Sequence, residues 1–140
     1  MDFDIDKMYC GVISRGDVFL FVGDFSAGDG KNEKKTMVVL QDNVLNEGMP
    51  TVVGAVIEPY EEGDDVFANE VLLAREESGL GVEGICMTHK VFAVDRRLIM
   101  EKRGNLKPFR LQDIYQALDI NLGRFRDRHI NDSIADILDQ

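Results

Sequence analysis

The sequence predicts a mainly β, α+β fold, in which a small β-barrel or strongly twisted antiparallel sheet of five or more strands is followed by C-terminal helices. Short apolar runs rich in β-branched and aromatic residues come first, and helical periodicity begins only after residue 105. The chain has 140 residues, 44% of them apolar, which suits one hydrophobic core. We therefore expect a single domain over residues 1–140.

The expected strands are short apolar segments in the first two thirds of the chain. Each is bounded by Gly, Asp, Asn or Pro and is shorter than a typical helix, a pattern that favours strands. The segments cover residues 17–22, 37–41, 51–57, 66–73 and 85–94.

Two apolar stripes at helical spacing follow the strands. The first consists of Leu111, Ile114, Tyr115, Leu118 and Leu122. These side chains share one face of a helix, for which Gly123 is a natural end. The second stripe consists of Ile130, Ile134, Ile137 and Leu138. We expect the helical segment 124–140 to pack on the domain or on a partner, because so short a helix is marginal alone.

The charge balance narrows the classes of function. Asp and Glu outnumber Lys and Arg by 26 to 16, a net charge of −10, so a broad basic footprint on nucleic acid is excluded and any RNA contact must be local. No apolar run approaches the roughly 20 residues that span a bilayer, and the acidic N-terminus is unlike a secretory signal. A cytoplasmic protein is expected. Cys10 and Cys86 lie among apolar neighbours and are predicted to be reduced and buried.

Four local features follow one another in a recognisable order. They are Arg15-Gly16-Asp17-Val18 at the first strand, Lys34-Lys35 before the second, Asn46-Glu47-Gly48-Met49-Pro50-Thr51 before the third, and Gly79-Leu80 before Gly84-Ile85 and Val94-Asp95-Arg96-Arg97-Leu98. Over residues 14–123 this order resembles the MazF/PemK (Kid-like) toxins of type II toxin-antitoxin systems. Residues 1–13 and 124–140 are then N-terminal and C-terminal extensions.

The resemblance implies a fold, an activity and partners. The fold is an SH3-like barrel that forms a homodimer. The activity is that of an mRNA interferase, an endoribonuclease that cleaves single-stranded RNA without a metal ion or other cofactor. The implied protein partner is a cognate antitoxin whose disordered segment lies along the barrel.

The chain departs from the family at the catalytic positions. Where the family has a catalytic Arg-Pro pair, this chain has Lys35-Thr36. Where one branch has a threonine, it has Glu58, and where another has an arginine and an aspartate, it has Met87 and His89. The scaffold resembles the family more closely than the site does.

Metal-independent RNA cleavage needs a base for the 2′-hydroxyl proton, an acid for the leaving 5′-oxygen and a cation facing the phosphate. The resemblance places Lys35 as the cation, Glu58 as the base and His89 as the acid. No metal ligands are predicted. The candidate RNA-binding residues are Lys31, Lys34, Lys90, Arg96 and Arg97.

Each assignment has an ordinary alternative. Lys35 can be a solvated residue of a loop, Glu58 the first residue of the acidic loop 58–65, and His89 a half-buried polar residue of a strand. Arg96 and Arg97 can hold phosphates or can be exposed at a strand end. The changed positions also fit a catalytically inactive binding module that acts through a protein partner, as the gyrase-poisoning toxin CcdB does on the same barrel.

Overall fold

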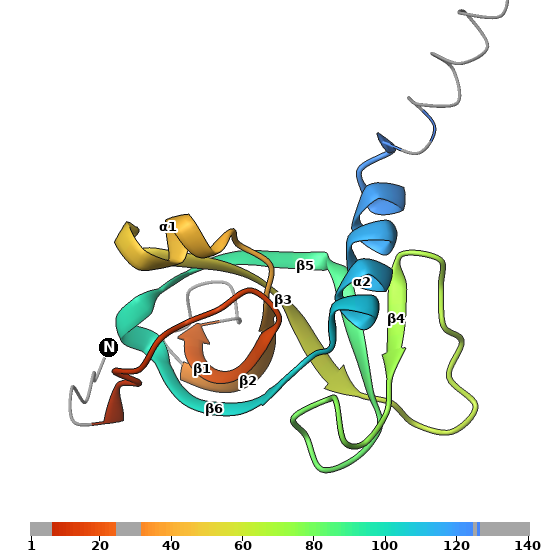
Figure 1. Cartoon of the computed structure of the whole chain (residues 1–140). Helices are drawn as coiled ribbons and strands as arrows, with labels where there is room; N and C mark the ends of the chain where they lie inside the picture. Colours follow the sequence, from red (N-terminus) through yellow and green to blue (C-terminus); the bar gives the residue numbers. More distant parts are fainter. Residues whose placement is uncertain (1–6, 25–31, 125, 127–140) are drawn as a thin grey trace, which may run out of the picture.

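The computed structural model describes residues 7–24, 32–124 and 126, and within them six strands form one antiparallel sheet. The strands are β1 (Asp17–Asp24), β2 (Asn32–Val39), β3 (Thr51–Pro59), β4 (Glu70–Leu73), β5 (Gly84–Asp95) and β6 (Ile99–Asn105). The helices are α1 (Asn43–Gly48), the 3-10 turn η2 (Arg96–Leu98) and α2 (Pro108–Asn121). The strand order across the sheet is β4-β5-β3-β2-β1-β6 (Figure 1).

The sheet curls strongly, so that β1, β2 and β6 surround a common interior with β3 and β5 (Figure 1). Register shifts interrupt the β1–β6 and β3–β5 ladders, and such bulges increase local twist and bend a sheet. No ladder joins β4 to β6 among the described residues, so the curled sheet is not closed. The α+β class and the strongly twisted antiparallel sheet are confirmed.

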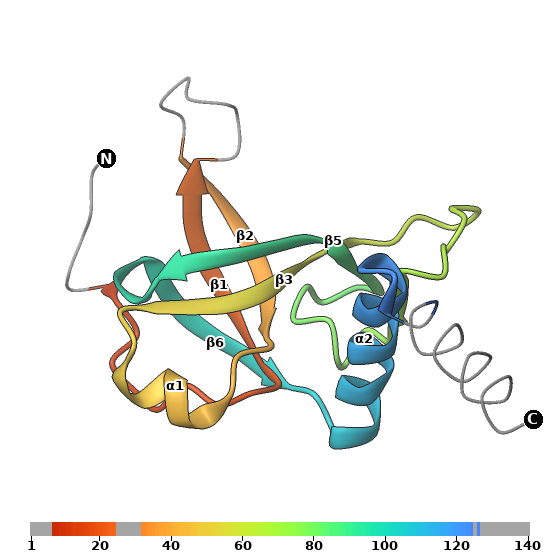
Figure 2. The same ribbon diagram turned by 90° about the horizontal axis from the view of Figure 1, so that it is seen from above.

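The two faces of the sheet build two apolar clusters, because successive side chains of a strand point to opposite faces. On β2, Met37 packs inside the curl with Phe19 and Phe21. The next residue, Val38, packs on the other face with Ile114 of α2. Figure 2 shows α2 beside β5, away from α1.

The predicted helix after residue 105 is confirmed as α2, which carries the first four residues of the stripe. Gly123 lies just beyond it with φ 76°, a left-handed backbone that glycine adopts without strain, and its N–H donates to the Ile120 carbonyl at 3.1 Å. The second predicted stripe, from Ile130 to Leu138, lies outside the described residues.

The strand prediction is correct in position but incomplete. The predicted strand 66–73 is shortened to residues 70–73, because a turn precedes it in which the Glu70 N–H donates to the Phe67 carbonyl at 2.9 Å. Helix α1, capped by the Asp42 side chain, and strand β6 were not predicted.

The two cysteines differ in exposure. Cys86 is buried, as predicted, and burial raises the pKa of its thiol to about 12. The prediction is wrong for Cys10, which is exposed on the segment before β1, where its Sγ donates to the Met8 carbonyl at 3.4 Å. In the part of the chain that is described, no helix combines the length and apolarity needed to cross a membrane.

Candidate functional site

Three of the residues singled out in the sequence meet on one face of the sheet. Lys35 Nζ of β2 lies 3.2 Å from Glu58 Oε1 of β3, and Lys90 Nζ of β5 lies 3.1 Å from the same oxygen. Two ammonium groups from two strands therefore converge on one carboxylate oxygen. We refer to these three residues as the Lys35–Glu58–Lys90 cluster.

The strand register explains why Lys35 meets Glu58. In the β2–β3 ladder Thr36 is opposite Ile57, which makes Lys35 and Glu58 the next cross-strand neighbours. Side chains alternate along each strand, so Lys35 shares the inner face with Met37, which lies two residues further along β2. The charged pair therefore continues the inner face of the sheet beyond the apolar core.

A bulge in β5 brings Lys90 to the same place. Ala55 pairs with Val91 but the next residue of β3, Val56, pairs with Met87, which leaves residues 88–90 without partners in this ladder. Two contacts anchor the bulge to the α2 side of the molecule. Thr88 Oγ1 donates to the Asn69 carbonyl at 2.6 Å, and Asn121 Nδ2 donates to the Thr88 carbonyl at 3.4 Å.

The cluster is partly buried and carries one positive charge in excess. The side chains of Lys35, Glu58 and Lys90 are 27%, 25% and 40% exposed. Burial alone would raise the pKa of the Glu58 carboxyl, but the hydrogen bonds and charges of Lys90 and Lys35 together outweigh it and hold the pKa below 4.5. Glu58 is therefore ionised at neutral pH and can accept a proton, while the two lysines can hold an anion.

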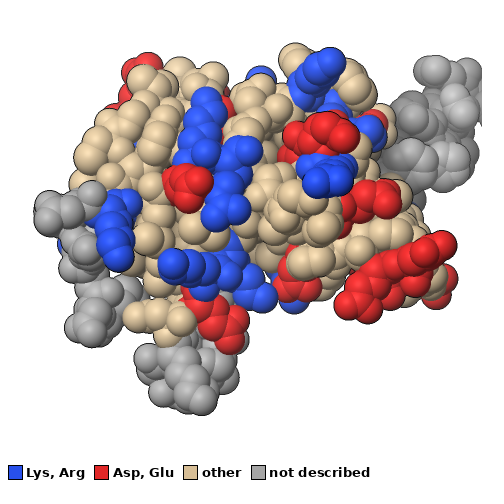
Figure 3. Space-filling view, turned by 90° about the horizontal axis from the view of Figure 1, so that it is seen from below, with Lys and Arg blue, Asp and Glu red and all other residues tan. Residues whose placement is uncertain are grey.

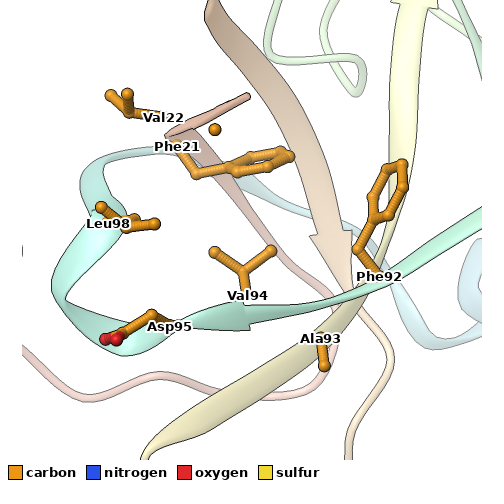
Figure 4. Close-up of a pocket in the computed structure, with 8 residues that line it drawn as sticks. Phe21, Val22, Phe92, Ala93, Val94, Asp95 and Leu98 are labelled. Atoms are coloured by element: carbon orange, nitrogen blue, oxygen red, sulfur yellow. The ribbon is translucent and has the colours of Figure 1, made fainter. Parts of the chain in front are cut away.

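An apolar pocket of about 180 Å³ lies on strands of the same site (Figure 4). Phe21 of the pocket is the cross-strand partner of Lys35, and Phe92 lies two residues after Lys90 on β5. The lining residues are Phe21, Val22, Gly23, Phe92, Ala93, Val94, Asp95 and Leu98. The sequence reasoning did not identify this pocket, although the pairing of two adjacent apolar strands could have placed Phe21 beside Lys35.

His89 and Lys34 lie outside the cluster. His89 is exposed on the bulge, one residue before Lys90, and forms no hydrogen bond or ion pair with the described residues. The alternative of a half-buried histidine is therefore wrong, and so is the alternative of a loop for Lys35, which is in β2. Lys34 is exposed on β2, and alternation directs it to the face opposite Lys35. Lys31 lies outside the described residues.

The two predicted arginines contact groups at the far end of β5. Arg96 is half-buried and donates to the Asn46 carbonyl, which ties η2 to α1. Arg97 is exposed, and its Nη2 lies 2.7 Å from Asp95 Oδ2. The structure does not bring either arginine into the Lys35–Glu58–Lys90 cluster.

Positive charge is local on this acidic molecule. Seen from the β6 side, Lys and Arg side chains group over the curled part of the sheet, while acidic side chains are prominent at the end that carries the loops around β4 (Figure 3). An anionic ligand therefore meets a locally favourable surface despite the net charge of −10. In the described ranges, no three His, Cys, Asp or Glu side chains are grouped so that they could hold a metal ion.

Comparisons with known proteins give one family and one fold. Residues 14–122 match the family model of the PemK-like, MazF-like toxins of type II toxin-antitoxin systems. An endoribonuclease from a mycobacterial species has a TM-score of 0.64 and 16% identity, over 82% of this chain and 95% of that one. A mycobacterial endoribonuclease in complex with its cognate antitoxin has a TM-score of 0.63 and 18% identity, over 79% and 95%.

A third similar structure is the crystal structure of MazE-MazF from Deinococcus radiodurans. It has a TM-score of 0.65 and 19% identity, over 81% of this chain and 98% of that one. At such identities the structural matches establish a shared fold, whereas the family model matches the sequence itself.

Proposed function

The chain belongs to the PemK-like, MazF-like toxin family of type II toxin-antitoxin systems, and we propose that it is an endoribonuclease that cleaves single-stranded RNA without a metal ion. The observation that carries the proposal is the Lys35–Glu58–Lys90 cluster, in which a carboxylate and two cations lie within hydrogen-bond distance on one face of the sheet. Two of the similar structures are described as endoribonucleases, which supports the same activity.

In the proposed reaction Glu58 removes the proton of the 2′-hydroxyl. The 2′-oxygen attacks the phosphorus atom, the bond to the 5′-oxygen breaks, and a cyclic 2′,3′-phosphate remains on one fragment. Lys35 and Lys90 face the phosphate oxygens, where negative charge builds up in the transition state. A single lysine lacks the two forked donors of an arginine, but two lysines from separate strands can contact two oxygens.

His89 is our candidate for the acid that protonates the leaving 5′-oxygen. It precedes Lys90 on the bulge, and its exposure leaves the imidazole accessible to a bound RNA strand. Imidazole is a suitable proton donor near neutral pH. The candidate RNA-binding residues Lys34, Arg96 and Arg97 lie outside the cluster, and the proposed reaction assigns no step to them.

The proposed setting is the cytoplasm, with a homodimer of this chain and a cognate antitoxin peptide as partners. Among the similar structures, one holds an endoribonuclease with its cognate antitoxin and another is a MazE-MazF structure. The dimer has a direct test, because light scattering should give a mass of twice 15.8 kDa. A mass of 15.8 kDa at micromolar concentration would contradict the dimer.

The decisive experiment compares the wild type with a Lys35→Ala/Glu58→Ala variant on a long single-stranded RNA in EDTA. We expect discrete cleavage by the wild type and a loss of about 100-fold or more in the variant, because base and cation are removed together. A Glu101→Ala/Arg103→Ala variant is the matched control, since it removes an ion pair of β6 outside the site. Intact RNA with folded wild type would contradict the nuclease and favour an inactive binding module.

A further inference from the structure

The two ammonium groups of the cluster contact the same atom, Glu58 Oε1. The position between them is thus an anion site that the chain fills with its own carboxylate. We propose that this site is exchangeable: a phosphate oxygen of RNA displaces the Glu58 carboxylate from Lys35 and Lys90, and the displaced carboxylate then acts as the base. The inference rests on the proposed function and adds how substrate binding and the base are coupled.

The contacts of Glu58 make the exchange feasible. Among the described residues, the hydrogen bonds to its side chain come from Lys35 and Lys90, at 3.2 and 3.1 Å, and not from a backbone N–H. Because no backbone N–H of the described residues is bonded to this carboxylate, it can turn away without disturbing the sheet. The flexible stems of the two lysines can follow an incoming anion.

Exposure and charge favour a phosphate as the incoming anion. Glu58 is 25% exposed and Lys90 is 40% exposed, so a ligand at the surface can reach the site. Ion pairs that contact water are weak, so breaking the contacts of Glu58 costs little free energy. The two ammonium groups remain paired with an anion during the exchange, because the phosphate replaces the carboxylate. RNA also adds favourable contacts that the free carboxylate does not have, from neighbouring phosphates and from bases.

The exchange has a chemical consequence for Glu58. Its pKa is held low by the hydrogen bonds and charges of Lys90 and Lys35, against the effect of burial. Once a phosphate occupies the two lysines, these influences are weakened and the pKa of Glu58 rises toward its usual range. A carboxylate of higher pKa is a stronger base. Phosphate binding would therefore activate the base at the moment when the substrate is in place.

The test uses a fluorescent oligothymidylate, which has phosphates but no 2′-hydroxyl and so cannot be cleaved by this route. Its dissociation constant is measured by anisotropy at low salt for the wild type, Glu58→Gln and Glu101→Gln. Glu58→Gln removes the carboxylate charge that contacts the two lysines, and we expect it to bind about threefold tighter than the wild type, the size expected for one partly exposed ion pair. Glu101→Gln removes the same charge from an ion pair with Arg103 on β6 and should match the wild type.

A third variant tests whether the tighter binding of the oligothymidylate depends on the two lysines. Adding Lys35→Ala and Lys90→Ala to Glu58→Gln should abolish the tighter binding, with thermal unfolding confirming that each variant is folded. The exchange is overturned if Glu58→Gln binds no tighter than Glu101→Gln, or if none of the proteins binds the probe. Cleavage of RNA by the wild type is measured in a separate assay. A nuclease without exchange would cleave RNA but show no tighter binding by Glu58→Gln. An exchangeable site without nuclease activity would show the tighter binding but no cleavage.

Discussion

Two clusters of charged side chains in this molecule are built from ion pairs but have opposite ratios of cations to carboxylates. In the Lys35–Glu58–Lys90 cluster two cations contact one carboxylate. In the other cluster one cation, Arg110 of α2, contacts the two carboxylates of Glu77 and Asp113. The Arg110 Nε lies 3.0 Å from Glu77 Oε2 and Nη1 lies 3.2 Å from Asp113 Oδ2. The first cluster therefore has a positive charge in excess and the second a negative one.

The two clusters differ most in what holds the carboxylate. Glu77 also accepts a hydrogen bond from the Ala74 N–H at 3.0 Å, so it links the turn after β4 to the first turn of α2 through both backbone and guanidinium. Burial would raise the pKa of Glu77, but the hydrogen bonds of Arg110 and Ala74 and the nearby charges lower it. The pKa of Glu58 is also lowered, so a lowered pKa alone does not separate a structural carboxylate from one that we propose as a base. The two carboxylates differ instead in the groups that hold them: a backbone N–H and a guanidinium hold Glu77, and two lysine ammonium groups hold Glu58.

The largest expected effect is on RNA cleavage, which should depend on the carboxylate of one cluster and not on that of the other. Glu58→Gln should reduce RNA cleavage in EDTA by about 100-fold or more, because an amide of the same shape cannot accept the proton. Glu77→Gln makes the same chemical change in the turn after β4, at the carboxylate that contacts Arg110, and should leave the cleavage rate unchanged. Single-turnover rates with saturating protein test both, and thermal unfolding shows whether each variant is folded. Cleavage by Glu58→Gln within tenfold of the wild type would place the base elsewhere.

The next effect separates the clusters by stability. Arg110→Ala should lower the free energy of unfolding by about 1 kcal/mol, because it leaves two carboxylates without their cation and Glu77 is only 19% exposed. Lys35→Ala should lower it by less than about 0.5 kcal/mol, since Lys90 still pairs with Glu58. Urea denaturation measures both values. A larger loss for Lys35→Ala than for Arg110→Ala would reverse the assignment of structural and functional roles.

The fold could be predicted where side-chain periodicity is strong. The apolar stripe that contains Leu111 and Ile114 predicts α2, because those residues form its buried face. Helix α1 has six residues and no apolar stripe, so its main local signal is the N-cap Asp42. Strand β6 is an edge strand with mostly exposed polar residues, which alternation does not reveal.

The site could be predicted only as a set of residues. The resemblance selected Lys35 and Glu58, and Lys90 was a candidate for RNA binding, but their shared oxygen depends on strand register and on the bulge at 88–90. Both are tertiary features, set by pairing of distant strands and by contacts such as Thr88 with Asn69. Arg96 has the residue type expected for phosphate binding, yet the fold uses it to hold α1.

The smallest expected effect compares how the two carboxyl groups respond to an anion. The pKa values of Glu58 and Glu77 are both lower in the folded protein than in the unfolded chain. The ion pairs of both residues therefore stabilise the fold at a pH above the unfolded pKa. This stabilisation is lost as the pH falls through the lowered pKa values. Oligothymidylate should raise the pKa of Glu58 toward 4.5, because its phosphates compete for Lys35 and Lys90. The pKa of Glu77 should not move, since Arg110 and the Ala74 N–H remain in place.

Carbon-13 NMR of the glutamate carboxyl groups measures both pKa values in one sample, and thymine does not titrate in the acidic range. Glu58→Gln and Glu77→Gln assign the two signals. Equal shifts of both groups would indicate a general electrostatic effect of the bound strand rather than exchange at one site. A rise confined to Glu58 would mean that its lysines can exchange the carboxylate for a phosphate, whereas the carboxylate held by a guanidinium and a backbone N–H stays bound.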